Sequence, residues 1–228
     1  MNQNEFNAFS NHLSAVAQEI PLRWGRIQND RTDGNINMFI CNTFTDLVNA
    51  LENLPNETQD YFKKRWFLWK CAQCDEFLFY QNEDIVSNPN FKDQDWDFEF
   101  FGRSDLRFDL KGTLVPRQIR ERNPSIIIPN DHMEIIRFNY EEQSKGVRNH
   151  HQNRLFVVHI PKIWNRENYL RANFEAKSIA YQAYVNKLRN NPNYKFFNYN
   201  GLKSDIIYLV ENPDNSISYE FASKSINP

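Results

Sequence analysis

The chain has little glycine, few cysteines and no long apolar run. Its 228 residues include six glycines and three cysteines. So few glycines predict regular elements with few flexible linkers, and a small, odd number of cysteines argues against a secreted disulfide framework. No apolar run reaches the roughly 18 residues that indicate a transmembrane helix. We therefore expect no membrane-spanning segment.

The chain also lacks a strong excess of charge of either sign. Its formal net charge is −2 and its pI is about 6.2, whereas a strongly basic domain would by itself have favoured nucleic-acid binding. Attraction to nucleic acid would have to come from local patches, such as the basic residues between positions 103 and 154. The start of the chain has neither the basic segment nor the apolar core of a signal peptide, so we expect a cytoplasmic protein.

Aromatic residues, by contrast, are abundant. They make up 15% of the chain, with 19 Phe, 10 Tyr and 5 Trp, and apolar residues reach 40%. This is enough for a packed core and too much for a disordered chain. At this length one domain is the better expectation. We expect residues 1–56 to form a helical extension that packs on a core made by residues 57–228.

The apolar spacing predicts a mixed α/β (α+β) fold, in which helices flank a central mixed β-sheet. Residues 116–153 read as a polar insertion that is irregular except for one short strand. The predicted helices cover residues 5–19, 45–54, 57–80 and 166–189. The predicted strands cover residues 38–41, 96–101, 106–111, 133–140, 154–160, 205–210 and 216–221.

The most informative segment is the acidic hairpin of residues 95–113. Side chains alternate across a strand, so Asp109 and Lys111 share one face. If the turn pairs Asp97 with Lys111, Glu99 faces Asp109, and all four charged side chains share that face. The apolar residues of the two strands then share the other face, which favours this register over one shifted by a single residue.

Carboxylates this close repel one another unless a divalent cation neutralises them. Mg²⁺ prefers oxygen ligands and is often held by one or two carboxylates together with substrate phosphates. A neighbouring lysine can orient or deprotonate an attacking water, or stabilise developing negative charge. The alternative interpretation is an exposed strand face of mixed charge.

The motif formed by Asp97, eleven further residues and Asp109-x-Lys111 resembles the core motif of the PD-(D/E)xK, or restriction-endonuclease-like, nuclease superfamily. The order of long helix, motif hairpin, strand, helix and strand is also similar, over roughly residues 57–211. Two departures stand out. Trp96 occupies the position of the motif's proline, and Asp105 competes for the first acidic position, although it lies only four residues before Asp109.

The resemblance implies a restriction-endonuclease-like core and a metal-dependent nuclease that hydrolyses phosphodiester bonds in DNA with Mg²⁺ or Mn²⁺. It implies Asp97 and Asp109 as metal ligands and Lys111 as the catalytic lysine. Many such nucleases dimerise to cut two strands, so the resemblance allows a homodimer, although no sequence feature indicates a dimer interface.

The resemblance also suggests supporting residues. Glu76 lies where the family often has an additional helical acid, with Glu99 as the alternative. Lys177 and Gln182 lie in the helix after the third core strand, where family members often place a Lys or Gln near the site. For both, an ordinary place on the helix surface is the competing interpretation.

Basic residues around the insertion are candidates for substrate contacts, with plain surface positions as the alternative. These candidates are Arg103, Arg148, His150 and His151.

Two other patterns carry weaker expectations. Cys71 and Cys74 have zinc-like spacing, but no second such pair exists and the two lie within a predicted helix, so we expect core thiols. The aromatic residues between Tyr194 and Tyr199 could stack on bases, or pack in the core.

Three functions therefore compete. The first is a metal-dependent DNA nuclease. The second is a catalytically inactive module of the same fold that binds nucleic acid or protein. The third is an unrelated α+β protein whose acidic hairpin is only surface. The presence of both Asp109 and Lys111 favours the first over the second, because a degenerate site tends to lose one of them.

Overall fold

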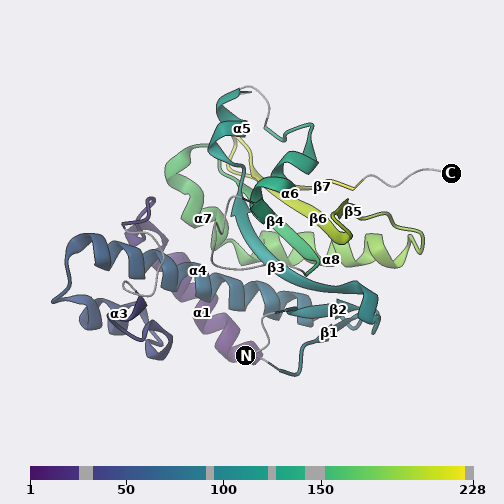
Figure 1. The fold of residues 1–228 in the computed structure, drawn as a ribbon. Coiled ribbons are helices and arrows are strands. Elements are labelled where there is room, and N and C mark those ends of the chain that lie inside the picture. Colours follow the sequence, from purple (N-terminus) through teal and green to yellow (C-terminus); the bar gives the residue numbers. More distant parts are fainter. Residues whose placement is uncertain (26–32, 91–94, 123–126, 142–151, 224–228) are drawn as a thin grey trace. The chain divides into compact units, whose positions relative to one another are not determined.

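The computed structural model describes the chain except residues 26–32, 91–94, 123–126, 142–151 and 224–228 (Figure 1). The contacts divide the chain into two compact units, and the boundary lies inside a long helix. The first unit is Met1–Asp75 with Ile163–Phe174, and the second is Glu76–Lys162 with Glu175–Pro228. The predicted boundary at residue 56 falls inside the first unit, and the single-domain organisation stays a prediction.

The first unit is helical. Its helices are α1 (Gln3–Val16), α3 (Phe44–Leu51), most of α4 (Asn56–Tyr80) and α7 (Glu167–Arg171), with the 3₁₀ turns η1 (Ala17–Glu19), η2 (Met38–Ile40) and η4 (Trp164–Arg166). Capping boxes start two of the helices: Asn2 with Glu5 begins α1, and Thr43 with Asp46 begins α3. Such reciprocal bonds satisfy amide groups that a helix start leaves free.

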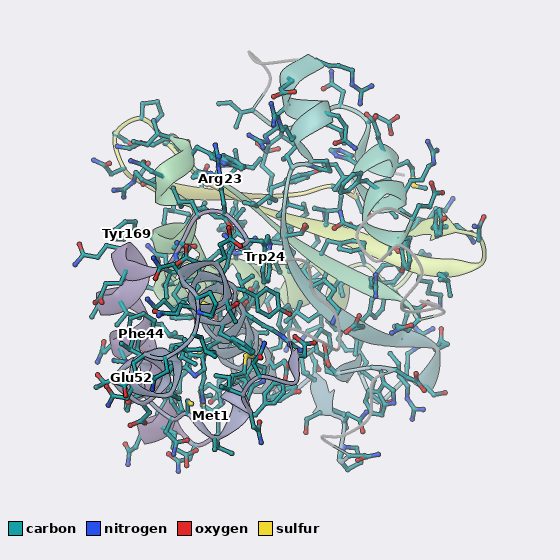
Figure 2. All side chains as sticks on the ribbon, turned by 60° about the vertical axis from the view of Figure 1, so that its left-hand side comes forward. Met1, Arg23, Trp24, Phe44, Glu52 and Tyr169 are labelled. Carbon is teal, nitrogen blue, oxygen red and sulfur yellow. The ribbon has the colours of Figure 1, made fainter. Side chains whose placement is uncertain are left out.

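Aromatic side chains fill the core of this unit. The indole of Trp66 is fully buried, and its Nε1 donates to the carbonyl oxygen of Cys41 at 2.9 Å. Phe44 packs against Trp66, and Trp24 packs against Tyr61, with ring centroids 5.9 and 5.6 Å apart (Phe44 and Trp24 are labelled in Figure 2). The unit therefore draws its stability mainly from buried rings.

In this unit the prediction for Cys71 and Cys74 is confirmed, whereas the prediction of a strand over residues 38–41 is wrong. Cys71 and Cys74 are buried thiols on α4, so the prediction of core thiols is confirmed. The strand predicted over residues 38–41 is wrong, because this segment forms η2. The side chain of Asn37 accepts a hydrogen bond from the Phe39 amide, which closes a tight turn.

The second unit is built on a mixed sheet. The strands follow the order β1-β2-β3-β4-β6-β5, and β7 also pairs with β6. The pairs β3–β4 and β4–β6 are parallel and the remaining pairs are antiparallel. The strands are β1 (Ile85–Ser87), β2 (Phe98–Phe100), β3 (Arg107–Leu114), β4 (Arg154–Ile160), β5 (Phe197–Tyr199), β6 (Leu202–Glu211) and β7 (Ile217–Phe221).

Helices cover both faces of this sheet, which confirms the predicted mixed sheet flanked by helices (Figure 1). On one face Ile135 and Ile136 of α6 (His132–Glu141) join a buried cluster with Phe156 and Ile206. On the other face α8 (Phe174–Arg189) packs its aromatic residues against the hairpin. The ring centroid of Tyr184 lies 6.1 Å from that of Phe100.

Among the described residues, the secondary structure of the insertion, residues 116–153, differs most from the one predicted. The strand predicted over residues 133–140 is wrong, because this segment is the helix α6, and α5 (Arg117–Arg122) precedes it. The side chain of Asp131 accepts from the Glu134 amide at 3.1 Å, which caps the start of α6. The helix predicted over residues 166–189 forms as two helices, α7 and α8.

Across the described residues, no helix is both long enough and apolar enough to cross a membrane.

Candidate metal and catalytic centre

The β2–β3 hairpin places the acidic motif residues. Its register pairs Phe98 with Phe108 and Glu99 with Arg107, and the amide of Asp97 donates to the carbonyl oxygen of Phe108 at 2.9 Å. Continuing this register sets Asp97 opposite Asp109. The predicted pairing of Asp97 with Lys111 is therefore wrong by two positions, although the parity, and hence the shared face, is retained.

The changed register also moves Glu99 away from the motif. Instead of facing Asp109, Glu99 forms an ion pair with Arg107, with Oε2 and Nε 3.0 Å apart. The cause is the connection between the strands. Its chain turns at Phe101 and Gly102, both with φ near +60°, and then forms the 3₁₀ turn η3 (Ser104–Leu106).

Two carboxyl groups meet at the centre of the site. Oδ2 of Asp97 accepts a hydrogen bond from the Leu110 amide at 2.7 Å, and Asp97 and Asp109 share a side-chain hydrogen bond. Burial first, and then the negative charge of Asp109, raise the pKa of Asp97 to about 6, against an opposing effect of Lys111. The pair thus favours a bound proton or cation near neutral pH.

Two cationic side chains hold Asp109. Nζ of Lys111 lies 2.7 Å from Oδ1, and Nε of Arg154 lies 3.2 Å from Oδ2. Lys111 is half-exposed, whereas Arg154 is 3% exposed and lies over the ring of Tyr140, 5.0 Å from its centroid. Lys111 can therefore reach a ligand in solvent, while the buried Arg154 fixes one oxygen of Asp109 from within the protein.

Arg154 is a site residue that the sequence reasoning missed. It opens β4, and the parallel register pairs it directly with Asp109. A charged residue at the head of an otherwise apolar strand is the signal that could have drawn attention to it. The pairing itself joins residues 45 positions apart, so no local pattern reveals it.

Glu76 comes close to the site through Tyr80. Both lie in the last turns of α4, and the Tyr80 hydroxyl lies 3.3 Å from the carbonyl oxygen of Asp97. Burial and the charges of Glu76 and Asp97 raise the pKa of Tyr80, which also shares a hydrogen bond with Glu76. The helical acid suggested by the motif is thus linked to Asp97 by one neutral tyrosine.

The donor set suits a hard divalent cation. The described residues contain no group of three or more His, Cys, Asp or Glu that could hold a metal ion. The adjacent carboxylates of Asp97 and Asp109 nevertheless meet the requirement of Mg²⁺, which takes one or two carboxylates and keeps water or phosphate as its other ligands. Burial and the neighbouring charge of Asp109 both raise the pKa of Asp97, and a divalent cation bound between the two carboxylates would offset the second of these effects.

Two further candidates, Lys177 and Gln182, belong to the helix α8. Tyr181 and Tyr184 of this helix pack on aromatic residues at the sheet face opposite to the one that bears Asp109. On this helix Lys177 is fully buried and Gln182 is exposed, and a role for either at the carboxylates stays a prediction.

The substrate-binding candidates divide into two groups. Arg103 lies in the hairpin connection, where its guanidinium pairs with both carboxylate oxygens of Asp105. This contact also occupies Asp105, the rival for the first acidic position. Arg148, His150 and His151 fall outside the described residues.

Comparison of the chain with protein-family models, with curated proteins and with solved structures finds no match to any of them.

Proposed function

We propose that the protein is a metal-dependent nuclease that hydrolyses phosphodiester bonds in DNA. The observation that carries this proposal is the convergence of Asp97, Asp109 and Lys111. Two carboxyl groups share a hydrogen bond, and the lysine amine lies 2.7 Å from one of them. The motif of the PD-(D/E)xK superfamily implies this set of groups. The order of α4, the β2–β3 hairpin, β4, α8 and β6 supports the proposal, with α5 and α6 lying between the hairpin and β4.

Each residue has a defined task in this proposal. Asp97 and Asp109 would hold Mg²⁺ or Mn²⁺, and the bound ion would supply Lewis-acid stabilisation of charge on the phosphate. Lys111, half-exposed at the mouth of the site, would orient the attacking water or stabilise the charge that develops at phosphorus. Arg154 holds the Asp109 carboxylate in place, and Tyr80 supports the backbone at Asp97.

A second candidate function is a catalytically inactive module of the same fold that binds nucleic acid or protein. One observation favours it. With both carboxylates ionised, the positive charges of Lys111 and Arg154 already balance Asp97 and Asp109, so the charges cancel without a metal ion. The convergence of Asp97, Asp109 and the half-exposed Lys111 supports the nuclease, because Lys111 can contact both a carboxylate and a ligand in solvent.

Cell compartment and assembly follow from the proposed activity. All three cysteines are buried thiols, which fits the reducing conditions of the cytoplasm. Cutting both strands of a duplex would engage two copies of the chain, as a homodimer.

Two measurements test the proposal together. Plasmid and single-stranded DNA are incubated with Mg²⁺ or Mn²⁺ and with the wild-type protein, Asp109→Asn or Lys111→Met. Mn²⁺ binding is measured separately by calorimetry. We expect cleavage only by the wild type, and loss of Mn²⁺ binding in Asp109→Asn but not in Lys111→Met.

The matched controls are Glu121→Gln and Lys162→Met, exposed or half-exposed positions away from the carboxylate pair, which should cleave as the wild type does. Cleavage that survives both site substitutions would show that the activity comes from another site or a contaminant. Mn²⁺ binding without any cleavage would favour the inactive module.

A further inference from the structure

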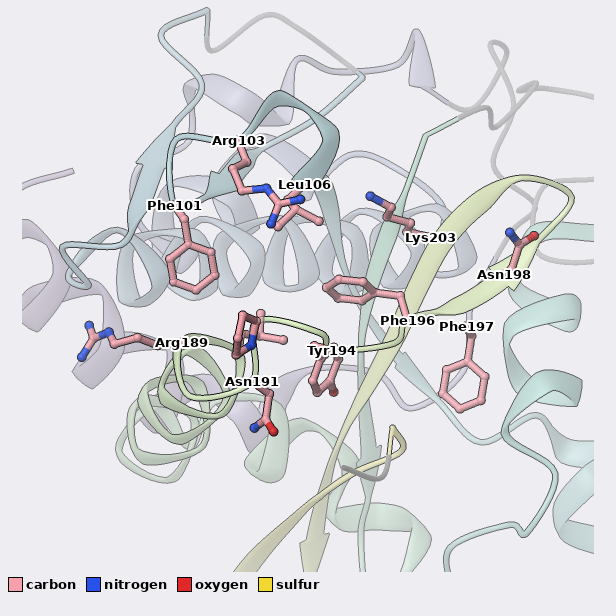
Figure 3. A pocket seen from close by; sticks show the side chains of 12 residues that line it. Phe101, Arg103, Leu106, Arg189, Asn191, Tyr194, Phe196, Phe197, Asn198 and Lys203 are labelled. Atoms are coloured by element: carbon pink, nitrogen blue, oxygen red, sulfur yellow. The ribbon is translucent and has the colours of Figure 1, made fainter. Parts of the chain in front are cut away.

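A cavity in the second unit lies apart from the carboxylate pair. It has a volume of about 450 Å³ and lies between the hairpin connection, the end of α8 and the start of β6 (Figure 3). This size is typical of pockets that take small organic ligands. Phe196 in its wall packs against Phe108, with ring centroids 5.2 Å apart. Because Phe108 and Asp109 point to opposite faces of β3, the wall formed by Phe196 and the carboxylates lie on opposite faces, whereas Phe197 packs toward α6.

The walls of the cavity are aromatic. Phe101, Tyr194, Phe196 and Phe197 all line it, and each remains partly exposed (Figure 3). Tyr194 is held in place by its hydroxyl, which donates to the buried carboxylate of Asp205 at 2.5 Å. Partly exposed rings fixed in position are suited to stack on a flat ligand such as a nucleobase.

The charges that line the cavity have one sign. Arg103, Arg189 and Lys203 are the charged residues of the lining, and Arg189 also pairs with Glu83 and Asp84 outside it. The half-exposed Asp105 pairs with the other two and orients both. Its Oδ2 is 3.0 Å from Nη2 of Arg103 and 2.8 Å from Nζ of Lys203. Pre-oriented cations around an otherwise apolar cavity favour a ligand that carries an anionic group.

The backbone at Phe101 supplies an independent observation. Phe101 has a φ of 59°, a left-handed conformation that bulky residues rarely adopt. Its amide donates to the carbonyl oxygen of Asp84, which holds the turn, and Figure 3 shows its ring directed at the cavity. Strain of this kind is retained where a side chain has a task that an easier residue, such as Asn or Gly, could not perform.

We propose that this cavity binds a nucleotide, with the base stacked among the aromatic rings and the phosphate at Arg103 and Lys203. The site is separate from the proposed nuclease centre. Its occupant is either a base of a nucleic-acid strand or a free nucleotide, and both present the same chemistry of a flat ring joined to a phosphate.

The experiment measures binding of dAMP by calorimetry, with deoxyadenosine and inorganic phosphate as part-ligands. We expect dAMP to bind more tightly than either part. The central variant is Phe101→Asn, which removes the ring while placing a residue that tolerates the left-handed backbone. Loss of one stacking contact should weaken dAMP binding roughly 5- to 150-fold while the unfolding midpoint is retained.

Two controls separate this proposal from the nuclease. Tyr219→Asn makes the same kind of change at an exposed aromatic residue of the same unit and should leave dAMP affinity unchanged. Asp109→Asn should also keep wild-type dAMP affinity, whether or not the nuclease proposal holds. Competition by a short single-stranded oligonucleotide would identify a strand base as the occupant, and failure to compete would identify a free nucleotide.

Two results would overturn the proposal. One is wild-type protein that binds dAMP no better than it binds phosphate. The other is folded Phe101→Asn protein that binds dAMP with unchanged affinity.

Discussion

At the scale of single residues, the candidate site brings two carboxyl groups and two cationic side chains into contact. Asp97 and Asp109 lie side by side, and two cations contact Asp109. Asp97 receives the Leu110 amide but remains difficult to ionise. Functional sites commonly retain such unfavourable charges, because the same groups are needed to bind a ligand or a metal ion.

The raised pKa of Asp97 predicts a pH-dependent gain of stability in Asp97→Asn. Above its ordinary pKa the unfolded state loses the proton that the folded state retains, so the wild type becomes less stable as pH rises from about 4 to about 6. Asparagine carries no charge and can still accept from the Leu110 amide. We expect the free energy of unfolding of the variant to exceed that of the wild type by about 1–3 kcal/mol at pH 7. At pH 4 we expect the two values to be equal.

Urea unfolding of both proteins between pH 4 and pH 8 measures this difference. Asp214→Asn is the control, because hydrogen bonds from Ser216 lower the pKa of Asp214 and so reverse the sign of its effect. A difference in the free energy of unfolding between Asp97→Asn and wild type that does not change with pH would contradict the raised pKa of Asp97.

Removal of Arg154 should leave a buried charge poorly paired. We expect Arg154→Met to lower the free energy of unfolding by about 3 kcal/mol, because Asp109 is 4% exposed and, among the described residues, would keep Lys111 as its one cationic partner. The double variant with Asp109→Asn should recover much of this loss. Chemical denaturation of the single and double variants gives the coupling energy.

Arg107→Met supplies the comparison at the surface. Its ion pair with Glu99 is partly exposed, so the loss should stay below about 1 kcal/mol. Equal losses at Arg154 and Arg107 would contradict the burial argument.

At the scale of elements, the hairpin is joined to two helices by stacked rings. Phe79 of α4 is fully buried and stacks on Phe98 of β2 and on Tyr181 of α8, with centroids 4.8 and 4.3 Å apart. Because Phe98 follows Asp97 directly, this stack positions the strand that carries the first carboxylate.

Phe79→Ala should therefore destabilise the second unit strongly. We expect a loss of about 3–5 kcal/mol in the free energy of unfolding, from the lost burial and the cavity left behind. Thermal unfolding measures it. Ile179→Ala on α8 is the control, because Ile179 is 56% exposed and should change stability by less than about 0.5 kcal/mol. A small loss at Phe79 would contradict its place at the centre of the stack.

The elements also explain which predictions from sequence succeeded. Period-2 alternation in β3, and the apolar runs of β4 and β6, locate strands without any tertiary information. The register of the hairpin was missed because η3 lengthens its connection. The residues of α6 predict a strand because Ile135 and Ile136 are β-branched, and such residues are frequent in strands. Asp131, which caps the helix, is the residue that indicates a helix instead.

Other features had no local signal to predict them. The strands β1 and β5 have three residues each, too few for an alternating pattern. Arg154 joins Asp109 only through a parallel pairing of distant strands. For the site itself, Asp97, Asp109 and Lys111 could be selected from the sequence because strand parity places them on one face, whereas Arg154 could not.

At the scale of the whole molecule, the two faces of the sheet in the second unit carry different chemistry. One face bears the carboxylate pair with Lys111, and the other bears the Phe196 wall of the aromatic and cationic cavity around Phe101. The first is suited to a metal ion and a phosphodiester, and the second to a nucleotide. Both proposals concern nucleic-acid chemistry, yet they depend on separate residues and can fail separately.

The most direct test of the central claim is the single-turnover rate of DNA cleavage in saturating Mg²⁺ by wild type and Lys111→Met. A lysine that stabilises charge at the reacting phosphate predicts a rate about 10²–10³-fold lower in the variant. Both proteins should bind DNA equally and both should be inactive when Mg²⁺ is chelated. Cleavage at the same rate by the two proteins, or none by the wild type, would contradict the account.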